Sequence, residues 1–135
     1  MEAIINYVDG VRFLAESRSH VVVCDQPRGN SGADTGMSPP EFLLASLGTC
    51  AAFYALQYLR ARSLAADGLK VRVAAEKALE PARLGSFQIE VVVPELEPRH
   101  TEGILRAVKS CLVHNTLLNP PVIEIVVQTA AAAKV

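Results

Sequence analysis

The sequence has 135 residues, of which half are apolar and a fifth are charged, and its formal net charge is −1. This length suits one domain over residues 1–135 with a core of its own, and the near-neutral charge removes the electrostatic argument for binding nucleic acid or an acidic membrane surface. The mean hydropathy of +0.26 is high for a small monomer, so we expect part of the apolar surface to lie in an interface between subunits.

The N-terminal stretch MEAIINYVDG lacks the basic segment and apolar run of a secretory signal. We therefore expect a cytoplasmic protein, and in that reducing compartment Cys24, Cys50 and Cys111 should be free thiols. A structural disulfide is not predicted, whereas a transient redox disulfide is compatible with this location.

The first third of the chain predicts a hairpin, a third strand and a long loop. Two apolar segments, AIINYV and VRFLAE, flank Asp9-Gly10, which is a common hairpin turn. HVVVC at 20–24 predicts another strand. DQPRGNSGADTG then supplies glycines and a proline without periodicity, which indicates a loop of about a dozen residues, a length often associated with function.

The apolar stretch MSPPEFLLASLGTCAAFYALQYLR, 37–60, predicts a central helix over about 39–63. Ser38 can cap this helix and Glu41 can complete a capping box. Residues 42–59 carry no charge, so the helix should be buried in a protein core or in a bilayer. Its polar residues and the strands that follow favour the protein core.

The remaining segments predict an α+β fold with mostly antiparallel sheet. LKVRVAA and FQIEVVV alternate apolar and polar residues, which predicts an antiparallel pair with one solvent-exposed face. Ile104, Val108, Cys111 and Leu112 then form a stripe of helical period, so a second core helix should bury Cys111. VIEIVVQ at 122–128 predicts a last strand, and the AAAAKV tail should fray, giving the order β-β-β-α-β-β-α-β.

Two cysteines on apolar helix faces are the constellation that suggests chemistry. A thiolate can attack a peroxide and become a sulfenic acid, and a second thiol can condense with that acid to form a disulfide. Cys50 and Cys111 could form such a pair if the fold brings them together. A buried free cysteine is also common as a small apolar side chain, so both interpretations stay open.

The run GADTGMSPPEFLLASLGTC, followed some sixty residues later by AVKSCLVHNTLL, resembles the OsmC/Ohr family of osmotically inducible and organic hydroperoxide resistance proteins. HVVVCDQP and the strand pair also follow the family's order. The resemblance implies that Cys50 is the peroxidatic cysteine and Cys111 the resolving one. It further implies reduction of organic hydroperoxides with a lipoyl or other dithiol reductant, no bound cofactor, and an intertwined homodimer with active sites at the interface.

The chain departs from the family pattern at the residues expected to activate Cys50. The family glutamate lies ten positions before the cysteine, where this chain has Pro40, and Glu41 lies nine before it, near the opposite face of a helix. Glu41 therefore has two interpretations, a helix cap and a catalytic group that orients the thiolate. The activating arginine would be Arg18 or Arg12, with Arg28 as a third candidate.

Other interpretations remain open at this point. Leu112 replaces the proline that often follows the family's second cysteine, so Cys111 could be a core cysteine. Cys24 is interpreted as structural, and no metal site is predicted because the histidines lack ligand spacing apart from Cys111-x-x-His114. The alternative function is a non-enzymatic dimeric protein that binds small molecules between its helices. An acyl-transfer enzyme would need a histidine beside Cys50.

Overall fold

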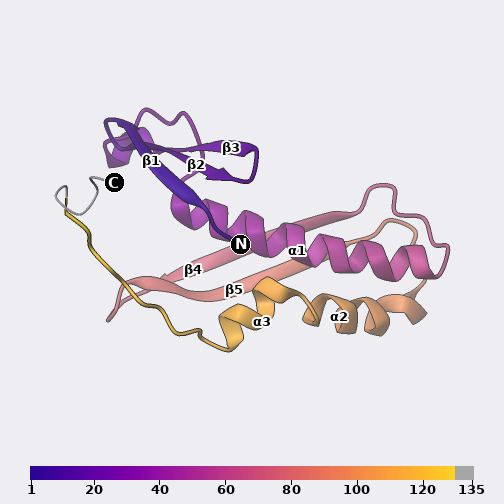
Figure 1. Cartoon of the computed structure of the whole chain (residues 1–135). Helices are drawn as coiled ribbons and strands as arrows, with labels where there is room; N and C mark the ends of the chain where they lie inside the picture. Colours follow the sequence, from indigo (N-terminus) through magenta and orange to yellow (C-terminus); the bar gives the residue numbers. More distant parts are fainter. Residues whose placement is uncertain (130–135) are drawn as a thin grey trace.

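A computed structural model of the chain describes residues 1–129 and has the α+β fold that the sequence predicts (Figure 1). The elements are, in chain order, β1 (Ile4–Asp9), β2 (Arg12–Ser17), β3 (His20–Cys24), α1 (Pro39–Ala61), β4 (Lys70–Ala78), β5 (Arg83–Val92), α2 (Thr101–Lys109) and α3 (Leu112–Leu118). Short 3-10 turns lie in the loop after β3 and before α2.

The first three strands form an antiparallel sheet in the order β1-β2-β3, as predicted. Gly10 takes a positive φ of 51° in the first turn, where a side chain would be unfavourable. Figure 1 shows this N-terminal sheet set to one side of the helices and the long β4–β5 hairpin, near the start of α1. Several of its apolar side chains are exposed, among them Ile5 at 58% and Tyr7 at 64%.

The predicted central helix and its cap are both present. The Ser38 side chain accepts the backbone N–H of Glu41, and the Glu41 carboxylate accepts the Ser38 N–H, so the capping box is complete. Leu47, Ala51, Ala55 and Leu59 form the buried stripe of α1, spaced four residues apart. By length and composition α1 could also cross a membrane, a test that an ordinary core helix passes as well.

The predicted antiparallel pair is the β4–β5 hairpin. Val73 pairs with Ile89 in its centre, and both side chains are half-buried, whereas Arg72 and Glu90 on the other face are exposed. The strands extend further into the connecting turn than the sequence indicated. Gly85 permits this extension, because a side chain there would collide with Ala78 of the facing strand.

The predicted second helix is two helices, which corrects the expectation of a continuous stripe through residue 112. α2 ends at Lys109, and Cys111, with φ −57° and ψ 129°, breaks the helix and caps α3. Leu112 consequently points away from the core and is 65% exposed. Ile104, Val108 and Cys111 are buried as predicted.

The helix α2 packs closely on the C-terminal part of α1. Gly103 lies against the ring of Tyr58, where an added Cβ would overlap the ring atoms. The Tyr58 hydroxyl is 3.0 Å from Nδ1 of His100, and the Arg62 guanidinium stacks on the same ring at 3.8 Å. This contact fixes the position of α2 and therefore of Cys111, which follows it.

The predicted last strand over 122–128 is wrong for the single chain. The described residues after α3 form no strand, and their apolar side chains are strongly exposed, for example Val122 at 90% and Ile123 at 78%. A strand requires a neighbouring edge for its backbone hydrogen bonds, and within residues 1–129 neither sheet pairs with this segment. The tail over 130–135 lies outside the described residues.

Candidate active site

Cys50 lies three turns after the start of α1, one residue away from the buried stripe through Leu47 and Ala51. The sequence predicted a thiol deep in the core, but the structure leaves Cys50 half-buried. The offset explains the difference, because neighbouring residues on a helix are rotated by about 100°. Cys50 therefore combines packing on one side with access from the other.

Cys111 is fully buried and lies beside Cys50. Burial, and after it the hydrogen bond with Cys50, raise the pKa of the Cys111 thiol above its ordinary value. The Cys111 sulfur also accepts the backbone N–H of His114 at 3.4 Å, which partly offsets these effects. The fold thus brings the two predicted cysteines together, with half-buried Cys50 against fully buried Cys111.

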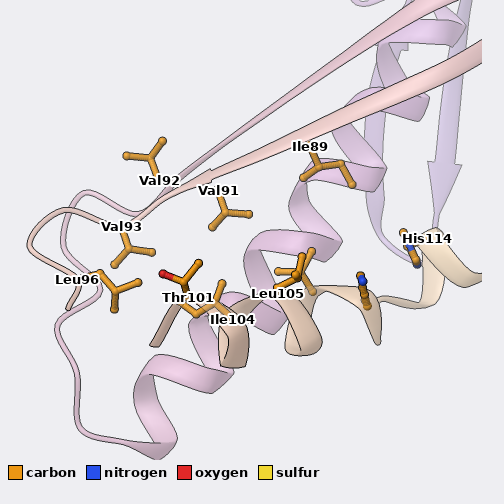
Figure 2. A pocket seen from close by; sticks show the side chains of 11 residues that line it. Ile89, Val91, Val92, Val93, Leu96, Thr101, Ile104, Leu105 and His114 are labelled. Atoms are coloured by element: carbon orange, nitrogen blue, oxygen red, sulfur yellow. The ribbon is translucent and has the colours of Figure 1, made fainter. Parts of the chain in front are cut away.

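Two apolar clefts run along β5, and they connect to the cysteine pair through His114, whose backbone contacts Cys111; neither lining includes Cys50 or Cys111. The β5–α2 cleft has a volume of about 570 Å³, and Figure 2 shows the aliphatic side chains of β5 and α2 facing one another across it, with His114 at one end. The β5–α3 cleft, of about 510 Å³, lies between β5 and α3 and includes Leu47 of α1. The two clefts share Ile89 and His114 in their linings.

Glu41 is used at the start of α1 rather than beside Cys50. Its carboxylate accepts the backbone N–H of Ser38 at 2.8 Å. Nine residues of helix separate it from Cys50, which is roughly 14 Å along the axis and half a turn around it. The structure therefore supports the capping interpretation and does not bring Glu41 to the sulfur of its own chain.

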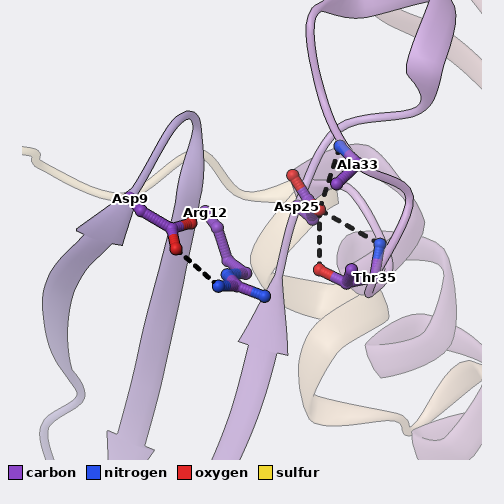
Figure 3. A network of polar contacts seen from close by, with 5 residues as sticks. All are labelled: Asp9, Arg12, Asp25, Ala33 and Thr35. Carbon is purple, nitrogen blue, oxygen red and sulfur yellow. Dashed lines mark hydrogen bonds and ion pairs between the residues drawn. The ribbon is translucent and has the colours of Figure 1, made fainter.

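The candidate arginines also lie apart from the cysteine pair. Arg12 pairs with Asp9 across the first turn at 2.6 Å, as Figure 3 shows, and Arg18 occupies an exposed turn with a φ of 56°. Within the described part of the chain, neither arginine makes a hydrogen bond or ion pair with a residue of α1. Arg28 is exposed in the loop that follows β3.

A buried acid that the sequence analysis missed holds the loop before α1. Asp25 is 1% exposed, and Figure 3 shows its carboxylate accepting the Thr35 hydroxyl, at 2.7 Å, and the backbone N–H groups of Ala33 and Thr35. The carboxylate also accepts the backbone N–H of Gln26. The Thr35 hydroxyl and then the backbone N–H donors lower the pKa of Asp25 from 3.8 to about 2. Its position, an acid directly after a strand and before a long loop, was the available signal.

The third cysteine connects the same loop to the sheet. Cys24 is half-buried at the end of β3, and its backbone forms a parallel bridge with Met37 just before the helix cap. The adjacent Asp25 N–H donates to the Met37 carbonyl at 3.2 Å. Both ends of the loop are thereby fixed, and the start of α1 is fixed with them.

Comparison with solved structures shows the same fold. A protein from Psychrobacter arcticus 273-4, provisionally described as an osmotic stress induced and detoxification response protein, has a TM-score of 0.77 at 20% identity, covering 84% of this chain and 85% of that one. The OsmC like protein of Mycoplasma pneumoniae has a TM-score of 0.70 at 21% identity, with 88% and 87% covered. The organic hydroperoxide resistance protein OsmC of Legionella pneumophila has a TM-score of 0.58 at 12% identity, with 87% and 89% covered.

No curated protein matches the sequence. The family model for the OsmC-like protein, by contrast, matches residues 32–126, which include α1, the β4–β5 hairpin and the helix pair around Cys111. This match covers more than half of the chain and contains both cysteines of the pair. The chain therefore belongs to the OsmC-like protein family.

Proposed function

We propose that the protein is a thiol-dependent peroxidase that reduces organic hydroperoxides through Cys50 and Cys111. The observation that carries this proposal is the contact between half-buried Cys50 and fully buried Cys111. His114, which contacts Cys111 through its backbone, lines two apolar clefts. A peroxide can approach the accessible thiol, and the inaccessible one is protected for the second step. The name of the Legionella pneumophila structure, an organic hydroperoxide resistance protein, supports the same chemistry.

The proposed first step is attack of the Cys50 thiolate on the distal oxygen of the hydroperoxide. The S–O bond forms as the O–O bond breaks, and the alkoxide takes a proton and leaves as an alcohol. In the second step the Cys111 sulfur attacks the Cys50 sulfenic acid, which forms a disulfide and releases water. A dithiol then exchanges with this disulfide and restores both thiols, so each hydroperoxide consumes two electrons from the reductant.

The lining of the clefts favours a substrate with an apolar body. β5 contributes aliphatic side chains to both clefts. Transfer of an alkyl or aryl group from water into such a cleft is therefore favourable. Hydrogen peroxide has no such group and should react more slowly. The reductant that we expect is a dithiol such as a dihydrolipoyl group, acting in a reducing cytoplasm.

We further propose that the active form is a homodimer. The N-terminal sheet exposes apolar side chains, and residues 122–127 form an exposed apolar stretch that has no strand partner within residues 1–129. A second copy could cover both surfaces by pairing strands. In such a dimer Arg18 or Arg12 of one copy would reach the Cys50 of the other and favour its thiolate.

Treatment of the reduced protein with cumene hydroperoxide tests the peroxidase proposal. Intact mass and peptide mapping should show a Cys50–Cys111 disulfide together with stoichiometric formation of the alcohol. Cys50→Ser should reduce hydroperoxide consumption to background. Cys24→Ser is the matched control, because this variant removes a half-buried thiol outside the pair and should keep full activity.

Three unchanged thiols after treatment with a modest excess of hydroperoxide would contradict the peroxidase function. That result would favour the alternative function, a non-enzymatic protein that binds small molecules in its apolar clefts. Continued turnover by Cys50→Ser would contradict the assignment of the peroxidatic cysteine.

A further inference from the structure

The second step of the proposed cycle requires a proton to move inside a closed region. Cys111 is 0% exposed, and burial followed by contact with Cys50 raises the pKa of its thiol, so at neutral pH it holds its proton. The thiol must lose this proton to attack the sulfenic acid, and the departing hydroxyl group must gain one to leave as water. A group that can both accept and donate a proton is therefore needed near Cys111.

His114 is an acid–base residue that is held against Cys111 through its backbone. Its backbone N–H donates to the Cys111 sulfur at 3.4 Å, which ties the residue to the thiol through the first turn of α3. Its half-buried ring lines both clefts at the point where they share Ile89. Nδ1 lies 3.4 Å from the Asn115 side-chain oxygen, an interaction that orients the ring when Nδ1 carries a proton.

The other side chains that line the two clefts are not suited to both accept and donate a proton near neutral pH. Among the described residues of the β5–α3 cleft, His114 is the titratable side chain, and its neighbours are aliphatic or aromatic apart from Ser86. In the β5–α2 cleft Lys109 is the other ionisable group, but a charged ammonium has no lone pair to accept a proton. Imidazole performs both transfers near neutral pH.

We infer that His114 is the proton carrier of the resolving step, an inference that rests on the proposed peroxidase function. The imidazole takes the Cys111 proton as the sulfur attacks Cys50. The S–S bond forms, the S–O bond breaks, and the same proton leaves with the hydroxyl group as water. No oxidant or reductant enters this step, and the first attack on the hydroperoxide does not use His114.

Rapid-mixing experiments on the full chain separate the two steps. The reduced protein is mixed with cumene hydroperoxide, and samples are quenched with dimedone to measure Cys50 sulfenic acid and mapped for the disulfide. In His114→Ala and His114→Gln we expect sulfenic acid to form within about twofold of the wild-type rate. Disulfide formation should be slower by about a hundredfold, the usual contribution of a positioned acid–base group.

Chemical rescue distinguishes proton transfer from a structural effect. Both variants keep the backbone N–H that contacts Cys111, and added imidazole can enter the open cleft of His114→Ala and should restore much of the rate. Thr116→Ala is the matched control on α3, since Thr116 is exposed and its hydroxyl donates a hydrogen bond to the Leu112 carbonyl of the same helix. This control should form the disulfide at the wild-type rate with or without imidazole.

The possible results distinguish a wrong role for His114 from a wrong peroxidase function. Disulfide formation within twofold of wild type in a folded His114 variant would overturn the role of His114, as would a slow step that imidazole does not accelerate in His114→Ala. If His114→Ala does not fold, the rate measured for His114→Gln decides. Wild-type protein that forms no Cys50 sulfenic acid would instead overturn the peroxidase function, and the resolving step would fall with it.

Discussion

At the scale of single residues, the buried thiol of Cys111 can affect the reactivity of Cys50 in addition to its proposed role in the resolving step. The raised pKa of Cys111, caused by burial and by Cys50, means that this thiol stays protonated next to its neighbour. A protonated thiol can donate a hydrogen bond to a Cys50 thiolate and stabilise it. The pair could therefore favour the reactive form of Cys50 without a cation from the same chain.

We predict that Cys111→Ser keeps the reactivity of Cys50 and that Cys111→Ala lowers it. Serine retains a hydroxyl donor, whereas alanine removes the donor, and a hydrogen bond to a charged group is worth about 1.5–3 kcal/mol. Alkylation of Cys50 by iodoacetamide, followed by peptide mass spectrometry, should be slower in the alanine variant by about tenfold or more. Equal alkylation rates in the two variants would show that Cys111 does not assist the thiolate.

Asp25 predicts a specific pH dependence of folding stability. Its pKa falls from 3.8 to about 2 on folding, because the Thr35 hydroxyl and several backbone N–H groups stabilise the carboxylate. The unfolded chain therefore binds this proton more readily, so the stabilisation is complete above about pH 5 and is lost as the pH falls through about 4 towards 2. Thr35→Val should lower the urea midpoint at pH 7 and flatten its decline in this acidic range.

Asp34→Asn provides the control for this prediction. Asp34 is an exposed acid of the same loop with a φ of 57°, a conformation that asparagine also adopts. The control should keep the wild-type acid dependence of the urea midpoint. If Thr35→Val and Asp34→Asn have the same profile, the hydrogen bonds of Asp25 do not stabilise the fold.

Residue types indicated the cysteine pair and the cap but not Asp25. Cys50 and Cys111 could be singled out because the segments around them resemble the OsmC/Ohr family, whereas a buried free cysteine by itself is a common small apolar side chain. Asp25 is buried without a cation, and its partners are N–H and O–H groups of a loop whose path no local pattern specifies. The burial of such an acid depends on tertiary structure.

At the scale of elements, the capping box of α1 gives a direct test of the two interpretations of Glu41. Glutamine can accept the same Ser38 N–H in a capping box, whereas alanine cannot. We predict that Glu41→Gln changes little and that Glu41→Ala costs about 1 kcal/mol of unfolding free energy, as lost caps do. Urea unfolding and hydroperoxide consumption measured on the same samples separate stability from catalysis.

Ser38→Ala is the matched control for the capping effect, because it removes the other half of the box. It should cost a similar free energy and leave the rate constant of Cys50 oxidation unchanged. A stable Glu41→Gln variant with a rate at least tenfold below wild type would instead establish a catalytic role for the carboxylate.

The break between α2 and α3 shows the limit of periodicity as a guide to elements. The apolar spacing continues through Ile104, Val108 and Cys111, so the pattern alone predicts one helix. The extended backbone of Cys111 interrupts it, and the sulfur replaces a missing partner for the His114 N–H. Neither the backbone angle nor a sulfur cap has a sequence signature as clear as a glycine or serine.

At the scale of the whole molecule, the strand pattern over 122–128 and the exposed apolar side chains of the same segment have one explanation. Within residues 1–129 this segment has no neighbouring strand with which to pair. The sequence is rich in β-branched residues there, and the single chain leaves them exposed. A strand pattern in the sequence specifies the need for a partner edge but not the chain that provides it. The fold of one chain could therefore be predicted more completely than the assembly.

We predict that Ile123→Lys combined with Ile125→Lys converts a dimer into a monomer and strongly lowers peroxidase activity. These side chains are 78% and 85% exposed in the single chain, so their replacement should not damage its own core. Lysine ammonium groups on an edge strand oppose pairing with another strand because they would lose their hydration in the interface. Light scattering after size-exclusion chromatography measures the mass, and consumption of cumene hydroperoxide measures the activity.

Leu79→Lys is the control for this double variant, since Leu79 is an equally exposed apolar residue, also 78%, in the β4–β5 turn. It should remain dimeric and active. If the double variant is a monomer with full activity, an arginine of a second copy is not required for Cys50 reactivity, and the Cys111 hydrogen bond becomes the better explanation. If wild-type protein is a monomer at all accessible concentrations, the pairing of residues 122–127 with a second copy is wrong.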